Sequence, residues 1–359
     1  MYRVPRSLRV AYTLEQCWHD VPGGSATAAL HVARRLAGMS ELELIGVAGR
    51  HRRPPDQAFT PPIEVRQLPL ARPWLYEAWN RLEWPSVERA TGAVDVCHST
   101  LAIPAATKAP HVVTVHDVAF VRAPERFTAH GVRVMRKGLE RCRRAELVLC
   151  PSATTIGDLV ELGFDERTVR LVPWGVAAEP VSAAEVQDVR SRYALPERFV
   201  LYVGTVEPRK NVARLARAAA TLSELPLVVA GAPGWGEAGQ DEDGVRFLGF
   251  VPDRDLPPLY ASATVFAYPS LDEGFGLPVA EAMAYGLPVV TSRGTATEET
   301  AGGAAVLVDA ADVDSIRDGL VTALDDALRL AARSRARAAE LSWDATVAAT
   351  LAAYREAAG

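Results

Sequence analysis

The chain has 359 residues, of which 49% are hydrophobic and 23% charged, and its formal net charge is -5 at pH 7. This length favours two domains. The negative net charge argues against a nucleic-acid-binding protein, because such proteins typically carry an excess of basic residues. No run reaches the roughly 18 apolar residues that span a bilayer, and Met1–Arg9 lacks the apolar segment of a signal peptide. The four scattered cysteines show no metal-binding spacing, so we expect reduced thiols in a cytoplasmic protein.

Short β-branched runs alternate with helical stretches along almost the whole chain. In the first half, the predicted strands are Leu8–Tyr12, Leu42–Ala48, Val94–Cys97, His111–Thr114, Leu147–Cys150 and Arg170–Val172. In the second half, they are Phe199–Val203, Leu227–Ala230, Val245–Phe247, Val265–Ala267 and Pro288–Thr291. Such alternation predicts an α/β fold of two Rossmann-like, doubly wound domains, 1–180 and 181–340. A final helix within 341–359 is predicted to return to the first domain.

The first predicted strand leads to Pro22-Gly23-Gly24-Ser25 and a predicted helix over 26–37. With Ser25 as the cap of this helix, the two glycines would present backbone N–H groups at its start, where anions bind. The loop lacks the G-x-G-x-x-G spacing, which argues against a dinucleotide-binding dehydrogenase. A Gly-Gly-Ser turn without a ligand is the alternative.

Two further features of the first half concern the acceptor or a membrane. Pro73–Trp79 and Trp84 concentrate aromatic side chains that could grip a sugar face, lie at a lipid interface or pack in the core. The segment Arg122–Arg144 contains eight basic and two acidic residues. It could contact anionic lipid as a basic helix, or form an ordinary solvated helix face.

Two histidines stand at the carboxyl ends of predicted strands. His116 precedes Asp117 in the run Val-Thr-Val-His-Asp, and His98 follows another strand. His116 could hydrogen-bond a ligand, and His98 could line an acceptor site. A lone histidine at a strand end also occurs as a structural residue.

The run Gly204-Thr-Val-Glu-Pro-Arg209-Lys210-Asn211 follows a predicted strand of the second half. Doubly wound sheets bind ligands at the carboxyl ends of their strands. There, Arg209 and Lys210 could neutralise a diphosphate, while Asn211 could cap the next helix. Two solvated loop cations are the alternative.

The run Asp253-Arg254-Asp255 superficially resembles a metal-binding Asp-x-Asp motif. Because it directly precedes a predicted helix over Leu256–Ser262, it suits a helix cap instead. We therefore predict no metal at this position.

The segment from Pro269 to Gly286 follows a predicted strand and contains a loop and the predicted helix that this loop opens. Its glycines Gly274 and Gly276 let backbone amides approach a ligand, and Pro278 suits the first helical position. The helix start is therefore a candidate anion site. Glu273 and Glu281 flank it, and carboxylates of this kind accept hydrogen bonds from vicinal hydroxyls. A helix-dipole role is the alternative for Glu281.

The run Glu-Gly-Phe-Gly-Leu-Pro-x-x-Glu-Ala-Met-Ala-x-Gly-x-Pro-Val-Val that begins at Glu273 resembles the signature of glycosyltransferase family 4. The members of this family are retaining enzymes of the GT-B fold. The resemblance implies two domains that face each other across a cleft, in which Glu273 contacts the donor sugar and Glu281 holds the ribose. It also implies that the amides of the intervening loop contact sugar and phosphate; these residues are Gly274, Phe275, Gly276 and Leu277.

The resemblance extends to further segments. It assigns the diphosphate to Gly204, Arg209 and Lys210, and it places Val251 beside the nucleobase. It also places the His116-Asp117 pair beside the donor sugar, where we assign His116 to catalysis and Asp117 to the acceptor side. It places Gly23 and Gly24 near the diphosphate or the acceptor.

Two positions depart from the family pattern. Thr205 stands where many relatives carry an arginine directly after the glycine. Trp174 replaces the asparagine of the usual Pro-Asn-Gly-Val, which could alter the acceptor pocket or the hinge between the domains.

Together these features predict a retaining transferase that moves a hexosyl group from a nucleotide-diphosphate sugar without a metal or other cofactor. GDP-mannose is favoured over a UDP-sugar. The acceptor is a hydroxyl of a glycan, a lipid-linked substrate or a small molecule, with peripheral membrane contact left open. The alternatives are a non-catalytic GT-B binding partner and a nucleotide-sugar 2-epimerase.

Overall fold

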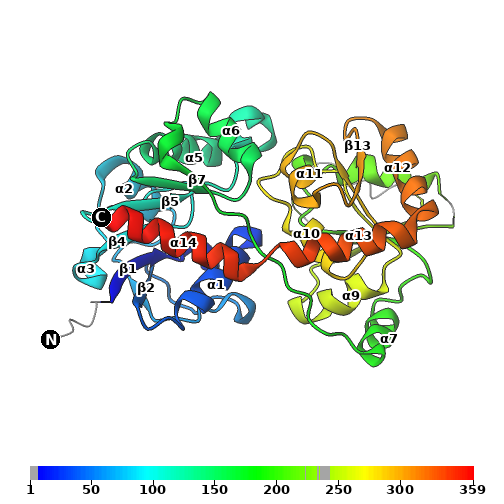
Figure 1. The fold of residues 1–359 in the computed structure, drawn as a ribbon, viewed down its shortest axis with the longest axis horizontal. Coiled ribbons are helices and arrows are strands. Elements are labelled where there is room, and N and C mark those ends of the chain that lie inside the picture. The colour runs from blue at the N-terminus through cyan, green and yellow to red at the C-terminus, as the bar shows by residue number, and fades with distance from the viewer. Residues whose placement is uncertain (1–6, 223, 233, 235–242) are drawn as a thin grey trace. The chain divides into compact units, whose positions relative to one another are not determined.

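The computed structural model describes residues 7–222, 224–232, 234 and 243–359 (Figure 1). Residues 1–6, which belong to the segment Met1–Arg9 considered in the sequence analysis, lie outside this range. The chain divides into two compact units: unit 1 comprises Met1–Trp174 and Trp343–Gly359, and unit 2 comprises Gly175–Ser342. The first crossing between the units thus falls a few residues before the predicted position at 180.

Unit 1 is built on a seven-stranded parallel sheet with the strand order β3-β2-β1-β4-β5-β6-β7. Its strands are β1 Leu8–Thr13, β2 Leu42–Ala48, β3 Val65–Gln67, β4 Val96–Ser99, β5 His111–Thr114, β6 Leu147–Cys150 and β7 Val169–Leu171. Its helices are α1 Gly23–Leu36, α2 Trp74–Leu82, α3 Glu88–Thr91, α4 Ala119–Arg122, α5 Ala129–Cys142, α6 Ala153–Glu161 and α14 Trp343–Ala358.

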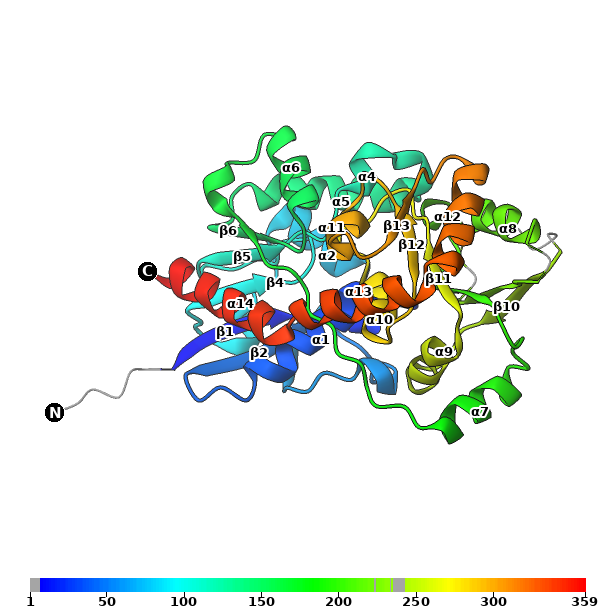
Figure 2. The same cartoon turned by 45° about the vertical axis from the view of Figure 1, so that its right-hand side comes forward.

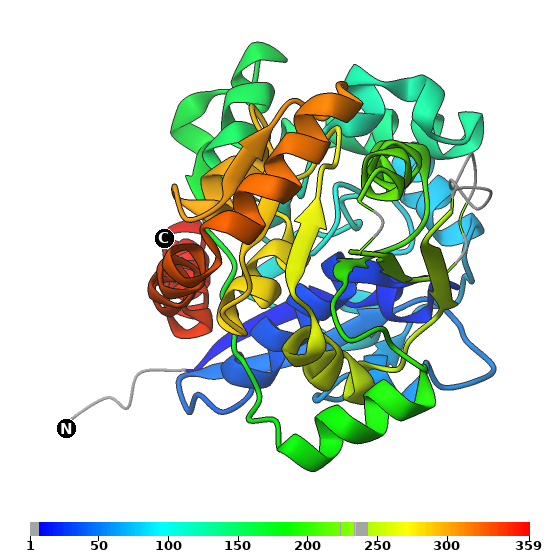
Figure 3. The same cartoon turned by 90° about the vertical axis from the view of Figure 1, so that its right-hand side faces the viewer.

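Unit 2 contains a six-stranded parallel sheet with the strand order β10-β9-β8-β11-β12-β13. Its strands are β8 Val200–Val203, β9 Leu227–Ala230, β10 Val245–Gly249, β11 Val265–Tyr268, β12 Val289–Ser292 and β13 Val306–Val308. Its helices are α7 Ala183–Arg192, α8 Val212–Ala220, α9 Leu256–Ser262, α10 Leu277–Ala284, α11 Ala296–Ala301, α12 Val313–Asp325 and α13 Ala327–Glu340. Figure 3, which turns unit 2 toward the viewer, shows α8 and α12 lying side by side.

Both sheets confirm the predicted doubly wound α/β architecture. Their central strands are apolar runs buried on both faces, as in β8 and β11. The predicted strands did not include β3 and β13. Both are edge strands of three residues each. β3 reads Val-Arg-Gln and is only partly buried, so no hydrophobic run marks it in the sequence.

The start of α1 differs from the prediction. The helix begins at Gly23, not at Ala26, and Pro22 occupies its N-cap position with φ -64° and ψ -40°. The ring of Pro22 fixes its φ near the helical value, and Gly23, the first residue of the helix, has φ +66°, a conformation that glycine adopts readily. Ser25 therefore lies within the first turn and does not cap the helix.

The last helix, α14, belongs to unit 1, where it packs against α1 (Figures 1 and 2). Trp343 stacks on His31 with 4.5 Å between the ring centroids. Near the other end, the buried Tyr354 hydroxyl lies 2.7 Å from Nδ1 of His98. These contacts tie the end of the chain to the core of unit 1.

The basic segment 122–144 is not the single helix that was predicted. It comprises the end of α4, a short 3-10 helix at Pro124–Arg126, and α5. Several of its guanidinium groups bind unit 1 itself: Arg143 donates to the Gly163 carbonyl, and Arg144 pairs with Glu83. Among the described helices, none combines the length and hydropathy needed to span a bilayer.

Candidate active site

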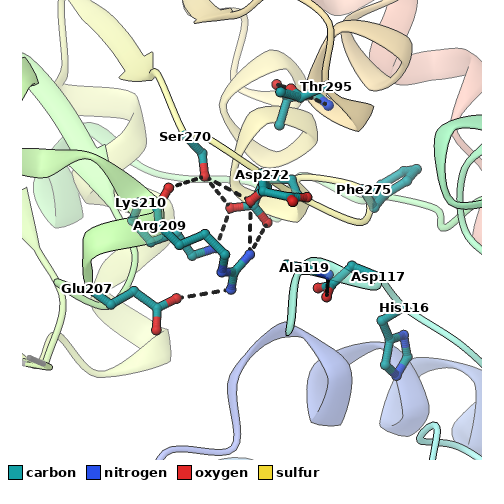
Figure 4. A network of polar contacts seen from close by, with 12 residues as sticks. His116, Asp117, Ala119, Glu207, Arg209, Lys210, Ser270, Asp272, Phe275 and Thr295 are labelled. Carbon is teal, nitrogen blue, oxygen red and sulfur yellow. Dashed lines mark hydrogen bonds and ion pairs between the residues drawn. The ribbon is translucent and has the colours of Figure 1, made fainter. Parts of the chain in front are cut away.

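The candidate site of unit 2 lies where the strand order of its sheet reverses. The strands β9 and β10 follow β8 on one side of it in the sheet, whereas β11, the next strand in the chain, lies on the other side of β8. Doubly wound sheets bind their ligands at this reversal, outside the carboxyl ends of the strands. The loop after β8 carries Arg209 and Lys210, and the loop after β11 carries Glu273. Figure 4 shows Arg209, Lys210 and Ser270 grouped together at this point.

Lys210 and Glu273 form a buried ion pair, with 2.5 Å between Nζ and Oε1. Oε1 also accepts hydrogen bonds from the hydroxyls of Tyr268, at 3.1 Å, and Ser270, at 2.8 Å. Burial alone would raise the pKa of Glu273, but the charges of Lys210 and Arg209 outweigh it and lower this pKa to about 2. The carboxylate is therefore ionised at every physiological pH.

Arg209 is held in place by three acceptors. Its Nη1 donates to the Asp272 carbonyl at 3.0 Å and lies 3.3 Å from Oε2 of Glu273, while Nη2 donates to Glu207 Oε1 at 3.0 Å. The two loops are also joined through their backbones, because the Leu271 N–H donates to the Arg209 carbonyl at 2.8 Å. Two cations are thus fixed at the reversal point before any ligand arrives.

The glycine loop ends at the start of α10. Gly276 occupies the N-cap position with φ +89°, a conformation that L side chains rarely adopt. A Cβ on this residue would lie 2.6 Å from Cγ2 of Thr297. Leu277 is the first helical residue, so Pro278 takes the second position, one later than predicted. Gly286 follows the end of the helix with φ +72°, the left-handed conformation that favours glycine at such positions.

The second carboxylate, Glu281, sits in α10 and accepts a hydrogen bond from the Tyr260 hydroxyl at 2.8 Å. Burial raises the pKa of Glu281 from 4.5 to about 7, the Tyr260 hydroxyl opposes this rise, and Asp253 adds to it. Glu281 therefore titrates near neutral pH, in contrast to Glu273. The two carboxylates respond differently because only Glu273 has cationic partners.

Three other predicted donor-side residues occupy distinct positions. Gly204 has φ +150° and closely approaches Gly231, where a Cβ would lie 1.8 Å from the Gly204 carbonyl oxygen. Val251 is buried just after β10. Asn211 precedes α8 but does not cap it; its side-chain amide instead donates to the carbonyls of Pro269 and Ala310.

The run Asp253–Asp255 was predicted to cap the helix that follows it, and the structure does not show this cap. Asp253 and Asp255 lie in a 3-10 turn before α9, and Asp255 makes no capping hydrogen bond. Its carboxylate instead accepts hydrogen bonds from Arg192 at 2.8 Å and from Tyr193 at 2.7 Å. Within the described part of the chain, no cluster of three or more His, Cys, Asp or Glu side chains is arranged to hold a metal ion.

In unit 1, His116 Nε2 lies 2.8 Å from the Thr100 carbonyl oxygen. Because a carbonyl oxygen only accepts hydrogen bonds, Nε2 carries the proton. Burial lowers the pKa of His116, so Nδ1 of the neutral ring is an acceptor, and it has no hydrogen-bond partner within the described residues. Trp174 packs edge-on against His116 at 5.3 Å between the ring centroids. The indole ring of Trp174 is therefore one of the groups that surround the imidazole ring of His116.

The remaining predicted residues of unit 1 have mixed outcomes. His98 is buried, and its two ring nitrogens contact the hydroxyls of Tyr354 and Thr114; its place on the acceptor side stays a prediction. Asp117 accepts a hydrogen bond from the Ala119 N–H at 3.1 Å (Figure 4). A Cβ on Gly23 or Gly24 would meet open space, so the start of α1 is accessible.

Sequence reasoning missed several residues of the site. Tyr268 and Ser270 stand immediately before the glycine loop, so their proximity to Glu273 was available as a signal. Tyr260 and Glu207 gave no comparable signal, because only the fold brings Tyr260 from α9 to Glu281 and turns Glu207 toward Arg209.

Comparison with known proteins identifies the class. Residues 197–326 match the family described as Glycosyl transferases group 1, and residues 22–179 match Glycosyltransferase Family 4. The chain is 38% identical to the O-antigen chain mannosyltransferase B of Escherichia coli, over 68% of this chain and 70% of that protein. It is 33% identical to the D-inositol 3-phosphate glycosyltransferase of Salinispora arenicola, over 93% of this chain and 87% of the relative.

Solved structures show the same fold at lower identity. The crystal structure of Anabaena HepE in complex with UDP and glucose superposes with a TM-score of 0.74 at 19% identity, covering 96% of this chain and 99% of that one. WaaG, a glycosyltransferase involved in lipopolysaccharide biosynthesis, superposes with a TM-score of 0.67 at 17% identity, covering 96% and 98% of the two chains.

The two doubly wound units and these structural neighbours show the GT-B fold. The family matches and the relatives show that the chain is a glycosyltransferase. More narrowly, the chain belongs to glycosyltransferase family 4.

Proposed function

We propose that the enzyme transfers a hexosyl group, with retention of anomeric configuration, from a nucleotide-diphosphate sugar that binds to unit 2. The observation that carries this proposal is the meeting of Arg209, Lys210 and the start of α10 at one reversal point of the sheet. The acceptor is a hydroxyl group of a glycan, a lipid-linked substrate or a small molecule.

The proposed chemistry relies on charge. Negative charge develops on the departing diphosphate as its bond to the anomeric carbon breaks. Arg209 and Lys210 are already fixed by Glu207, Glu273 and the Asp272 carbonyl, so little reorganisation is needed to stabilise that charge. The amides at the start of α10 add a positive helix end.

Glu273 and Glu281 receive separate roles in this proposal. Glu273 is a buried carboxylate. Its Oε2 lies 3.3 Å from Nη1 of Arg209, and a carboxylate oxygen in this position can also accept a hydrogen bond from a hydroxyl of the donor sugar. The lowered pKa of Glu273 makes it a stable ion and a weak nucleophile, which favours same-face attack by the acceptor over a covalent intermediate. Glu281 accepts hydrogen bonds from the ribose.

GDP-mannose is our first choice of donor, and a UDP-sugar is the second. The first choice is supported by the relative that is named as a mannosyltransferase, at 38% identity. The second is supported by the structural neighbour HepE, which was crystallised with UDP and glucose. We further propose that transfer needs no metal, since the Asp255 carboxylate is already engaged by Arg192 and Tyr193.

The test is product analysis with the purified chain. GDP-mannose, UDP-glucose and related donors are supplied with a panel of hydroxyl acceptors, in buffer with EDTA or with Mg²⁺. We expect one donor to yield an α-linked product, observed by NMR of the anomeric proton, at equal rates in both buffers. A β-linked product from an α-linked donor would disprove retention, and a strict requirement for Mg²⁺ would disprove metal independence.

A further inference from the structure

Trp174, one of the two departures from the family pattern, packs against His116 in unit 1. The two rings meet edge-on, with 5.3 Å between their centroids and an angle of 62°. His116 follows β5 and Trp174 follows β7, so only the fold brings the two side chains together. His116 is a predicted catalytic residue, whereas Trp174 has no role in the proposed transfer.

The main chain at His116 is fixed, but few polar contacts hold its ring. The His116 carbonyl accepts a hydrogen bond from the Thr155 hydroxyl at 3.2 Å, and ring Nε2 donates to the Thr100 carbonyl at 2.8 Å. The buried Nδ1 accepts no hydrogen bond from any described residue. Because the χ2 torsion of a histidine is broad, one hydrogen bond does not by itself fix the plane of the ring.

A cavity beside His116 gives the ring space to move. It has a volume of about 30 Å³, and its lining includes both His98 and His116, Trp174, and Thr346 and Thr350 of α14. Such a space holds roughly two water molecules and is too small for a sugar ring. Both nitrogens of His98 are engaged by hydroxyl groups. Of these two histidines, His116 is therefore the one whose orientation depends on packing.

Trp174 is itself held in place by the last helix. The buried Thr346 hydroxyl donates to the Pro173 carbonyl at 2.7 Å. One residue earlier, the Val172 N–H donates to the Cys150 carbonyl at 2.7 Å, next to β6. The main chain that leads into Trp174 is thus fixed to β6 and to α14. The asparagine of the usual family pattern would have no ring to pack against His116.

We propose that Trp174 is a positioning residue that fixes the plane of the His116 ring, so that Nδ1 accepts a hydrogen bond from a substrate hydroxyl in one orientation. Thr346 supports Trp174 through the Pro173 carbonyl. This inference rests on the proposed function, since both residues act through His116 in the same transfer. It also gives a physical role to the departure from the family pattern at position 174.

Thr350 provides a matched control for Thr346. Both threonines lie in α14, both are 2% exposed, and both line the cavity. The Thr350 hydroxyl donates to the Thr346 carbonyl within the helix, whereas the Thr346 hydroxyl reaches Pro173. T346V therefore removes the support of Trp174. T350V removes a hydroxyl from the same cavity and leaves that support in place.

Initial rates compare the full-length wild type with W174N, W174F, T346V and T350V, using whichever of GDP-mannose and UDP-glucose turns over. We expect W174N to lower kcat about tenfold to a hundredfold, because a misplaced catalytic group loses that much. T346V should lower kcat about threefold to tenfold, the worth of one hydrogen bond. W174F keeps an aromatic ring and should recover most of the rate, and T350V should resemble the wild type. The Kd of GDP or UDP, proposed to bind to unit 2, should be unchanged in every variant.

Imidazole ¹⁵N NMR at pH 7 observes the ring without any substrate, and H116Q assigns its signal. In the wild type, W174F and T350V, His116 should be a single neutral tautomer with the proton on Nε2, because Nε2 donates to the Thr100 carbonyl. In W174N, the signal should shift toward an average of the two tautomers, because the ring is no longer held in one plane.

A double-variant cycle separates positioning from general stability. In an H116A background, W174N should have almost no further effect on kcat, because Trp174 acts through His116. An equal loss in both backgrounds, or a wild-type imidazole spectrum in W174N, would overturn the positioning role of Trp174. Equal effects of T346V and T350V would overturn the role of Thr346. If the wild type turned over no donor, the proposed function alone would fail, because the imidazole spectra still decide the inference.

Discussion

At the scale of single residues, the two carboxylates of unit 2 differ in what surrounds them. Glu273 is ionised because two cations offset the cost of its burial, whereas Glu281 has one hydroxyl partner and a pKa of about 7. One carboxylate therefore acts as a fixed charge, and the other responds to pH. Each difference leads to a separate prediction.

Replacing Lys210 with methionine should lower both the stability and the transfer activity of the enzyme. The change leaves the buried Glu273 without its nearest counterion, which costs about 3–5 kcal/mol of the free energy of unfolding. The double variant K210M/E273Q removes both charges and should recover most of that loss. Transfer should fall by at least about a hundredfold in both variants, because the diphosphate loses a cation.

Urea denaturation and initial-rate measurements test this pair, with R254Q as a control at an exposed arginine of the same unit. If K210M/E273Q were as unstable as K210M, the buried pair would not explain the loss. Near-normal transfer by K210M would remove Lys210 from the catalytic role.

Glu281 should make stability and donor binding depend on pH in opposite directions. Its folded pKa lies above the ordinary value of 4.5, so its contribution to stability is complete below pH 4.5 and is lost as the pH rises through about 7. The shift corresponds to about 3 kcal/mol. The ionised form accepts ribose hydroxyls better, so the donor KM should fall between pH 6 and pH 8.

The measurement is urea denaturation at pH 5 and pH 8, together with donor KM at pH 6 and 8, for wild type and E281Q. E281Q cannot titrate and should lack both pH effects. A KM profile that is identical in wild type and E281Q would show that another group is responsible.

At the scale of elements, the loop into α10 depends on one backbone conformation. Gly276→Ala places a Cβ at φ +89° and 2.6 Å from the Thr297 side chain, so we expect a loss of about 1–3 kcal/mol and weaker donor binding. Gly157→Ala is the control, since Gly157 lies inside α6 and a Cβ there meets open space. It should gain about 0.5–1 kcal/mol. Thermal unfolding with and without GDP-mannose compares the two, and equal stability of both variants would refute the strain.

The elements also show how far the sequence can predict this fold. Buried strands such as Leu42–Ala48 and Leu147–Cys150 were predicted with their observed bounds, because the turn residues Gly49 and Pro151 follow them directly. The predicted start of α1 was wrong by three residues, because Pro22, and not the expected Ser25, occupies the N-cap position. Contacts such as Tyr260 with Glu281 could not be predicted, since they depend on how α9 packs beside α10.

At the scale of the whole molecule, the last helix completes unit 1 after the chain has formed unit 2. Removing residues 343–359 takes away the buried Trp343 and Tyr354 and leaves His98 without its hydroxyl partner. We expect the truncated chain to lose cooperative unfolding of unit 1 while unit 2 persists. Calorimetry combined with limited proteolysis detects this as protection of a fragment that spans unit 2. An unchanged melting profile would contradict the assignment of α14 to unit 1.

The central claim is that unit 2 binds a nucleotide-diphosphate sugar through Arg209, Lys210 and the start of α10. Titration calorimetry of the full chain with GDP-mannose, UDP-glucose, GDP and UDP tests it most directly, with K210M/E273Q in parallel. We predict that one nucleotide sugar binds to the wild type, that its diphosphate alone retains most of the affinity, and that the double variant binds both at least about tenfold more weakly. Binding of the same strength to the double variant would contradict the account.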